Sequence, residues 1–144
     1  MEISQKGINL IKTFETFKSD AYICPAGKLT IGYGHTEGVT KGQKVTKAEA
    51  EKLLQKDLTS AENAVNKMFK EGLPQNKFDA LVSFAFNVGN GAFFSSNLCN
   101  KVQTNPNDTE IRTEFEKWTK AKGQVLQGLV KRRKAEADLY FETK

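Results

Sequence analysis

The chain has 144 residues, of which 38% are hydrophobic and 10% aromatic, and its net charge is +5. It is too apolar for a disordered chain and long enough for one compact unit with a sizeable core. No stretch approaches the roughly 18 consecutive apolar residues of a membrane-spanning helix, so we expect no stable membrane insertion. The positive charge favours a polyanionic partner such as nucleic acid, anionic lipid or an acidic cell wall, without choosing among them.

The first segment favours a short amphipathic helix. Ser4 is a favourable N-cap, and Ile8, Ile11 and Phe14 follow at helical spacing. The helix would end by placing Glu15 at the edge of an apolar surface. This segment lacks a basic region leading into an uninterrupted apolar core, so a secretory signal is not expected.

The next segment predicts a β-hairpin. Residues 21–23 and 29–33 are rich in β-branched and aromatic side chains, which is typical of strands. Between them, Pro-Ala-Gly-Lys at 25–28 predicts a tight turn, because proline presets φ and glycine accepts positive φ. The hairpin carries a thiol, Cys24, and a hydroxyl, Thr30. A carboxylic acid, a thiol and a hydroxyl so close in sequence suggest an active site on the lip of a cleft.

A glycine-rich loop and a long helix follow the hairpin. The glycines match neither GxxxxGK[ST] nor GxGxxG, so we expect no nucleotide site, and a third short strand is expected near Val39 or Val45. Residues 46–49, Thr-Lys-Ala-Glu, have the sequence of a capping box. Apolar residues then recur at helical intervals to about Lys70, which predicts a helix roughly 35 Å long. Such a helix would connect two lobes.

The C-terminal half is predicted to be helical. Residues 78–88 are apolar on nearly every side, which is typical of a helix in the middle of a core, and Gly-Asn-Gly at 89–91 would end it. Three more helices are expected: a short one after Ser95 or Ser96, one bearing Ile111, Phe115 and Trp118 after a polar loop at 104–108, and a last one near 128–142.

The spacing of three residues identifies a family. Glu15 is followed after eight residues by Cys24, and Cys24 after five by Thr30, with Ile-Gly-Tyr-Gly-His directly behind. This resembles the phage-type lysozymes (glycoside hydrolase family 24), whose triad of Glu, Asp or sometimes Cys, and Thr has the same intervals. Three further stretches resemble the endolysins of that family in the same order, so the resemblance covers nearly the whole chain: 46–58, 78–91 and 128–140.

The resemblance implies a single domain, 1–144, with an α+β, mostly helical, phage lysozyme-like fold. A small β-hairpin lobe (about 15–50) and a larger helical lobe (about 71–144, with the N-terminal helix 4–14) would be joined by the long helix at about 47–70. The glycan strand would bind in the cleft between the lobes. The implied activity is that of an endolysin, a muramidase that hydrolyses the β-1,4 bond between N-acetylmuramic acid and N-acetylglucosamine of peptidoglycan, with no cofactor.

The family assigns a role to each member of the triad. Glu15 would be the general acid, and its phenylalanine neighbours would desolvate it, which favours the protonated carboxyl that this role needs. Cys24 would orient water or stabilise positive charge, which requires a thiolate and therefore a lowered pKa. The alternative for Cys24 is a small buried hydrophobe. Thr30 would hold the attacking water, and otherwise is an ordinary strand residue.

Three more residues are candidates for substrate binding or support of the site: Tyr33, His35 and Arg132. His35 is expected to support the cleft rather than act as a base, and with no second histidine and no clustered carboxylates we predict no metal site. The basic run 131–134 is either a solvated helix face or contains an arginine that turns inward near the catalytic Glu, as in relatives. Arg132 aligns better than Arg133 for that role, and both stay open.

The expected partner is a peptidoglycan glycan strand. The basic run has no interleaved aromatic residues, so nucleic acid is not expected. Cys24 and Cys99 are expected to stay reduced. We expect a monomer that accumulates in the host cytoplasm and acts on the wall in the periplasm after release by a separate holin.

Two alternative functions remain open at this stage. A lytic transglycosylase would cleave the same bond without water and yield 1,6-anhydro products. A non-catalytic basic module would bind the wall or nucleic acid without cleaving anything.

Overall fold

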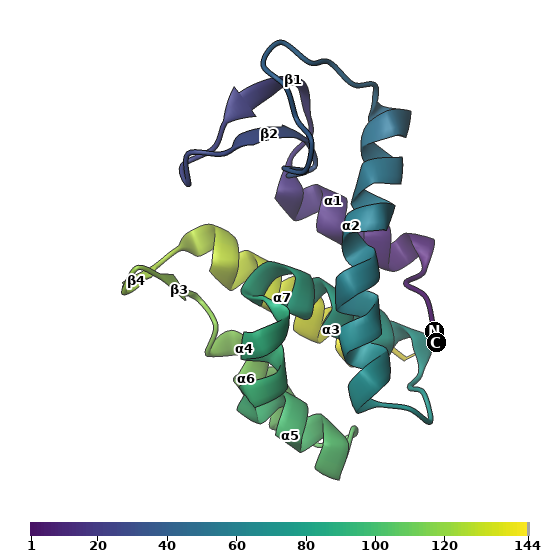
Figure 1. The fold of residues 1–144 in the computed structure, drawn as a ribbon. Coiled ribbons are helices and arrows are strands. Elements are labelled where there is room, and N and C mark those ends of the chain that lie inside the picture. Colours follow the sequence, from purple (N-terminus) through teal and green to yellow (C-terminus); the bar gives the residue numbers. More distant parts are fainter. Residues whose placement is uncertain (144) are drawn as a thin grey trace. The chain divides into compact units, whose positions relative to one another are not determined.

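The structure is a computed structural model that describes residues 1–143, and it is mostly helical with two small antiparallel sheets (Figure 1). The chain forms two compact units: residues 11–59, and residues 1–10 together with the chain from residue 60 onward. The elements in chain order are α1 (Gln5–Glu15), β1 (Lys18–Ile23), β2 (Leu29–Gly32), α2 (Lys47–Met68), α3 (Gln75–Val88), α4 (Asn90–Ser95), α5 (Asn97–Thr104), α6 (Ile111–Glu116), β3 (Lys120–Ala121), β4 (Gln124–Val125) and α7 (Gln127–Tyr140).

The unit of residues 11–59 contains the predicted hairpin. β1 and β2 pair antiparallel, with Tyr22 opposite Thr30 and the next pair following in regular register up to the turn. Gly27 in the turn has φ +83°, a conformation that glycine adopts without strain. The third strand expected near Val39 or Val45 is not formed. A single bridge between Asp20 and Lys44 takes its place, because only a few residues of this loop run beside β1.

The capping box at the start of α2 is confirmed. The Thr46 N–H donates to Glu49 Oε1 at 2.9 Å, and the Glu49 N–H donates to Thr46 Oγ1 at 3.1 Å. Since two N–H groups that the helix leaves unpaired are satisfied in this way, α2 begins where the sequence predicts. It ends at Met68, ahead of the predicted Lys70, and Gly72 follows with φ +85°.

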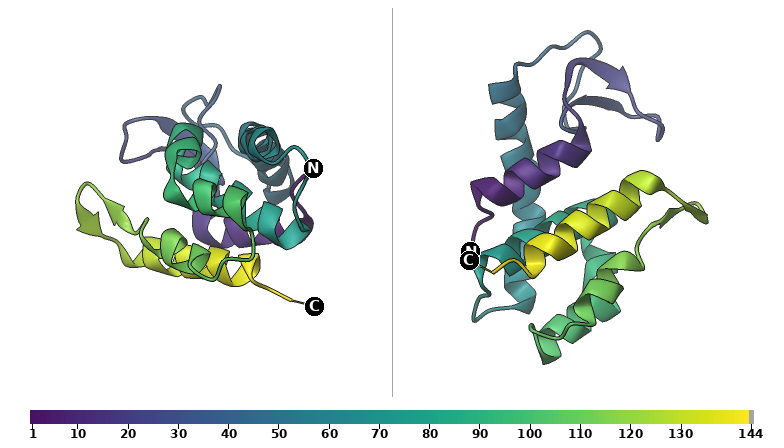
Figure 2. Two further views of the ribbon diagram at one scale, coloured as in Figure 1. Left: turned by 90° about the horizontal axis from the view of Figure 1, so that it is seen from below. Right: turned by 180° about the vertical axis from the view of Figure 1, so that it is seen from behind.

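The other unit is built around α3. Residues 77–85 of this helix are all buried, as expected of a helix without a polar face. α3 packs against α7 and α4, and α6 also packs against α7 (Figure 2). The Phe84 ring meets Phe115 and Trp118 edge-on, with centroids 5.6 and 5.5 Å apart.

Three details of this half differ from the sequence prediction. After Gly89 (φ +99°) a further helix, α4, begins, where the sequence predicted only a stop. α6 ends before Trp118, which therefore lies outside the helix that was expected to carry it. The β3–β4 hairpin was not predicted at all. Its turn, Lys122-Gly123, has two positive φ angles, +52° and +79°, as in the turns favoured for two-residue hairpins.

No helix in residues 1–143 is both long enough and apolar enough to span a bilayer.

Candidate active site

Glu15 is the last residue of α1 and is half-buried. The chain turns sharply after it, since Thr16 has φ +49°. The loop behind β2 approaches the carboxylate closely: a Cβ atom added at Gly34 would lie 3.4 Å from Glu15 Oε1. Gly34 itself has φ +86°, a backbone conformation in which any other side chain would be strained. This accounts for a glycine in the Ile-Gly-Tyr-Gly-His sequence.

Cys24 and Thr30 lie on the two arms of the β1–β2 hairpin near its turn, Cys24 half-buried and Thr30 only 3% exposed. A hydrogen bond from the Thr30 hydroxyl lowers the pKa of the Cys24 thiol, and the backbone N–H groups of Lys28 and Ala26 lower it further. The turn therefore surrounds the sulfur with donors that stabilise a thiolate.

The second cysteine shows the contrast. Cys99 is fully buried on α5, and burial raises the pKa of its thiol to about 11. Both cysteines are free thiols. The two side chains thus have opposite environments: Cys99 packs as a small hydrophobe and its pKa is raised, whereas hydrogen bonds lower the pKa of the half-buried Cys24 thiol from its ordinary value.

His35 ties the loop after β2 to α2. Its Nδ1–H donates to Asp57 Oδ2 at 2.8 Å, since a carboxylate can only accept, and the ring is 6% exposed. Its backbone N–H donates to the Ile31 carbonyl at 2.9 Å. This arrangement fits the expected supporting role. Asp57 could not be paired with His35 from the sequence, because they lie 22 positions apart on different elements.

Tyr33 is also a packing residue in this structure. Its ring is 6% exposed and lies 5.5 Å from the Phe17 ring, centroid to centroid. Lys12 Nζ lies 5.6 Å from the Tyr33 centroid, within range of a cation–π interaction. Tyr33 therefore supports the loop from behind and offers little surface to a ligand.

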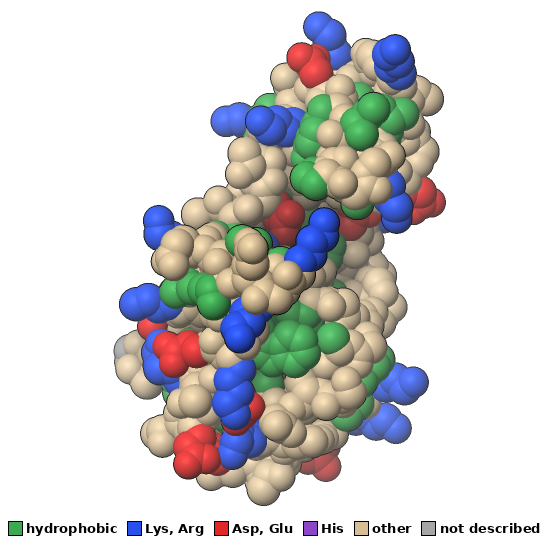
Figure 3. Space-filling model, turned by 90° about the vertical axis from the view of Figure 1, so that its left-hand side faces the viewer, with side chains coloured by type: hydrophobic (Ala, Val, Ile, Leu, Met, Phe, Trp, Pro, Cys, Tyr) green, Lys and Arg blue, Asp and Glu red, His purple; other side chains and the backbone are tan. Residues whose placement is uncertain are grey.

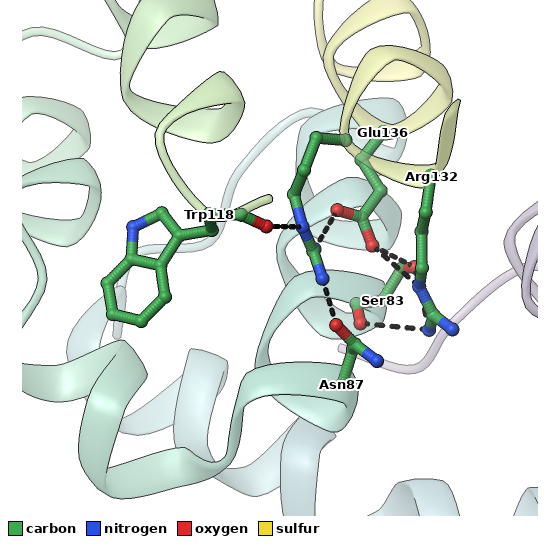
Figure 4. Close-up of polar contacts among 6 residues, drawn as sticks. Ser83, Asn87, Trp118, Arg132 and Glu136 are labelled. Atoms are coloured by element: carbon green, nitrogen blue, oxygen red, sulfur yellow. Dashed lines mark hydrogen bonds and ion pairs between the residues drawn. The ribbon is translucent and has the colours of Figure 1, made fainter. Parts of the chain in front are cut away.

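The basic run on α7 divides into two solvated and two buried members. Lys131 and Lys134 are exposed, whereas Arg132 and Arg133 turn inward, 3% and 0% exposed. The solvated-face interpretation is therefore wrong for both arginines. They meet at Glu136, which the sequence analysis did not single out (Figure 4).

The buried network around Glu136 is fully hydrogen-bonded. Arg132 Nε donates to Glu136 Oε2 at 3.3 Å, Ser83 Oγ donates to the same oxygen at 2.5 Å, and Arg133 donates to Oε1. Arg133 Nε also donates to the Trp118 carbonyl at 3.0 Å. Burial raises the pKa of Glu136 and lowers that of Arg133, while their mutual attraction opposes both shifts.

Charge is spread widely over the surface. Figure 3 shows Lys and Arg side chains scattered over the face that it presents. From Lys117 to Lys134 the sequence has five lysines, two arginines and no acidic residue. Within residues 1–143 no group of His, Cys, Asp and Glu side chains could hold a metal ion.

The model of the phage lysozyme family matches residues 12–136. The chain belongs to the phage lysozyme family. Its predicted identity as a glycoside hydrolase of this family and its predicted fold are thereby confirmed. Among solved structures, the chain resembles the muramidase domain of SpmX from Asticaccaulis excentricus, with a TM-score of 0.90, 39% identity and 99% of each chain covered. It also resembles an endolysin from Escherichia coli O157:H7 phage FAHEc1, with a TM-score of 0.89, 37% identity, and 99% of this chain and 94% of that chain covered.

Relatives in sequence are phage endolysins of two lengths. The chain is 47% identical to the endolysin of Bacillus phage PZA, covering 97% of this chain but only 55% of that protein. It is 40% identical to the endolysin of Acyrthosiphon pisum secondary endosymbiont phage 1, covering 97% of this chain and 98% of that protein. The chain thus spans about half the length of some relatives and nearly all of others. The roles of Glu15, Cys24 and Thr30 remain predictions.

Proposed function

We propose that the chain is an endolysin muramidase that hydrolyses the β-1,4 bond between N-acetylmuramic acid and N-acetylglucosamine in bacterial peptidoglycan. The observation that carries this proposal is the environment of Cys24. The residue at the second catalytic position of the family must be an anion to stabilise positive charge or orient water, and hydrogen-bond donors of the hairpin itself favour the Cys24 thiolate. The relatives, an endolysin and a muramidase domain, support the same activity.

In the proposed reaction, Glu15 donates its proton to the glycosidic oxygen as the bond from that oxygen to the anomeric carbon breaks. Positive charge develops on the anomeric carbon and is stabilised by the Cys24 thiolate. A water molecule that donates a hydrogen bond to the Thr30 hydroxyl oxygen attacks this carbon, and its proton passes to the thiolate to give a thiol. Exchange with solvent then restores the protonated Glu15 and the ionised Cys24. Water attacks from the side opposite the leaving group, so the product has the inverted anomeric configuration.

The partner of this reaction is the glycan strand, and the protein acts as a monomer without cofactor. It accumulates in the host cytoplasm and reaches the wall in the periplasm once a separate holin permeabilises the membrane. The positive charge of the chain suits an anionic wall. His35 supports the hairpin unit from within, because its side chain is buried and held by the Asp57 carboxylate. Arg132 is likewise buried and held by Glu136 in the helical unit.

Lysis of purified cell walls tests the proposal. Wild-type protein should clear a suspension of sacculi, and Glu15→Gln should not, while Glu37→Gln, the same substitution at an exposed loop position, should act as wild type. Mass spectrometry of the products separates hydrolysis from the alternative: reducing ends carrying a water-derived oxygen support a muramidase, whereas 1,6-anhydro ends indicate a lytic transglycosylase. Binding to the sacculi without any cleavage would contradict both.

A further inference from the structure

β1 presents an exposed aromatic residue next to the candidate site. Tyr22 is 38% exposed, and its neighbour Ile23 is 70% exposed. Within residues 1–143 the Tyr22 side chain has neither a ring contact nor a hydrogen bond, and more than a third of it is exposed. The other two tyrosines, Tyr33 and Tyr140, are buried and in ring contact.

The strand register places Tyr22 on the same face of the hairpin as the thiol and the hydroxyl. Tyr22 lies directly opposite Thr30, and the Cβ atoms of such antiparallel partners are about 5 Å apart. Cys24 directly follows the last residue of β1, and its N–H donates to the Lys28 carbonyl across the turn at 2.9 Å, so the pairing continues and its side chain is expected on the same side as that of Tyr22, two residues before it. Ile23, paired with Leu29, points to the other side. The ladder is regular from Tyr22 to the turn; its irregularity lies before Tyr22.

We propose that Tyr22 is a sugar-stacking residue, whose ring covers the apolar face of one sugar of the glycan strand and holds that strand against Cys24 and Thr30. This rests on the proposed function and adds a substrate contact to it. The axial C–H groups of a pyranose ring carry small positive charge and form a flat apolar surface, which the negative face of an aromatic ring attracts. A tyrosine also loses little conformational freedom when it binds, because it has only two side-chain torsions.

Stacking would help the reaction by orientation. Attack by a water held at Thr30 succeeds only when the anomeric carbon lies within near-attack distance and in line, and a ring fixed on the same strand as Cys24 provides a rigid reference for the sugar. The hydroxyl of Tyr22 is not required for this effect. The ring is.

Four proteins test the proposal: wild type, Tyr22→Phe, Tyr22→Leu and Ile23→Ala. Tyr22→Leu keeps apolar bulk without a ring, and Ile23→Ala is the matched control on the opposite face. Initial rates of lysis are measured over a range of sacculus concentrations. A second arm measures binding of each variant to sacculi in a Glu15→Gln background, where no cleavage interferes, and thermal unfolding checks that each variant is folded.

Tyr22→Leu should lower kcat/KM and weaken sacculus binding by about tenfold, the scale of an aromatic stacking contact. Tyr22→Phe and Ile23→Ala should stay within about twofold of wild type. Full activity and binding of Tyr22→Leu would overturn the proposal, and so would a Tyr22→Phe variant as impaired as Tyr22→Leu, since that would assign the effect to the hydroxyl. Failure of wild type to lyse sacculi would instead refute the proposed function, and the binding arm would still judge Tyr22.

Discussion

Replacing Glu136 by glutamine should strongly destabilise the protein. Glu136 is fully buried and accepts hydrogen bonds from Arg132, Arg133 and Ser83. Glutamine is nearly the same size but uncharged, so Glu136→Gln leaves two buried guanidinium groups without a carboxylate. The NH₂ group of the new glutamine amide would also face hydrogen-bond donors and would find no acceptor for its own protons.

The magnitude follows from the cost of an uncompensated buried charge. Removing one partner of a buried ion pair typically costs about 3–5 kcal/mol. Unfolding entropy is about 2.1 cal/mol/K per residue, so for 144 residues the same loss lowers Tm by roughly 10–16 °C. Asp138→Asn on the same helix is the matched control. Asp138 is 50% exposed and pairs with Arg112 and Lys134 at the surface, where an ion pair contributes about 0–1 kcal/mol.

Calorimetry or thermal circular dichroism of the three proteins at neutral pH measures the difference. We expect Glu136→Gln to unfold at least about 10 °C below wild type, and Asp138→Asn within about 3 °C of it. Equal, small losses in both variants would refute the reasoning. That result would mean that Glu136 is already protonated in the folded protein, so that burial outweighs the two guanidinium groups in setting its charge.

Three further predictions concern the site. Glu15→Gln should reduce the rate of wall lysis by at least about 100-fold with unfolding temperature preserved, since general-acid catalysis contributes about 10²–10⁴-fold. Iodoacetamide should alkylate Cys24 and inactivate the enzyme. The alkylation rate should rise with pH around a midpoint lower than that of an ordinary thiol, because the pKa of Cys24 is lowered, and Thr30→Val should move this midpoint to higher pH. Cys99, with a pKa of about 11, is ionised in roughly one molecule per thousand at pH 8 and should stay unmodified in a peptide map. Cys24→Asp should keep activity and shift the pH optimum of lysis downward, whereas Cys24→Ser should lose most activity because a hydroxyl stays neutral; full activity of Cys24→Ser would make the thiol a packing residue.

Local signals made much of the fold predictable. The N-cap at Ser4, the turn around Gly27 and the capping box at Thr46 and Glu49 each lie within a few residues of the element that they define. The β3–β4 hairpin was missed because strands of two residues show no periodicity. Its only signal is the Lys122-Gly123 pair, a weak version of the Asn-Gly turn.

Long-range partners could not be predicted from the sequence. Glu136 and Ser83 are 53 positions apart, and His35 and Asp57 are 22 apart, so their contacts exist only once the helices have packed. Each of these acids is an ordinary helix residue in the sequence. The basic run stayed ambiguous for the same reason: nothing local distinguishes the buried Arg132 and Arg133 from the exposed lysines beside them.

The Thr30 hydroxyl links the two tasks proposed for the hairpin, because it has a single proton. In the structure this proton is donated to the Lys28 carbonyl at 3.0 Å, which leaves the hydroxyl oxygen free to accept. When Cys24 ionises, the hydroxyl can rotate and donate to the sulfur. The Lys28 carbonyl loses little by this, since it still accepts from the Cys24 N–H at 2.9 Å. In the rotated state the hydroxyl would donate to the thiolate while its oxygen accepts a hydrogen bond from water. Thr30→Val removes both the donor to the sulfur and the acceptor for water, so we expect it to raise the pKa of Cys24 and to impair lysis together.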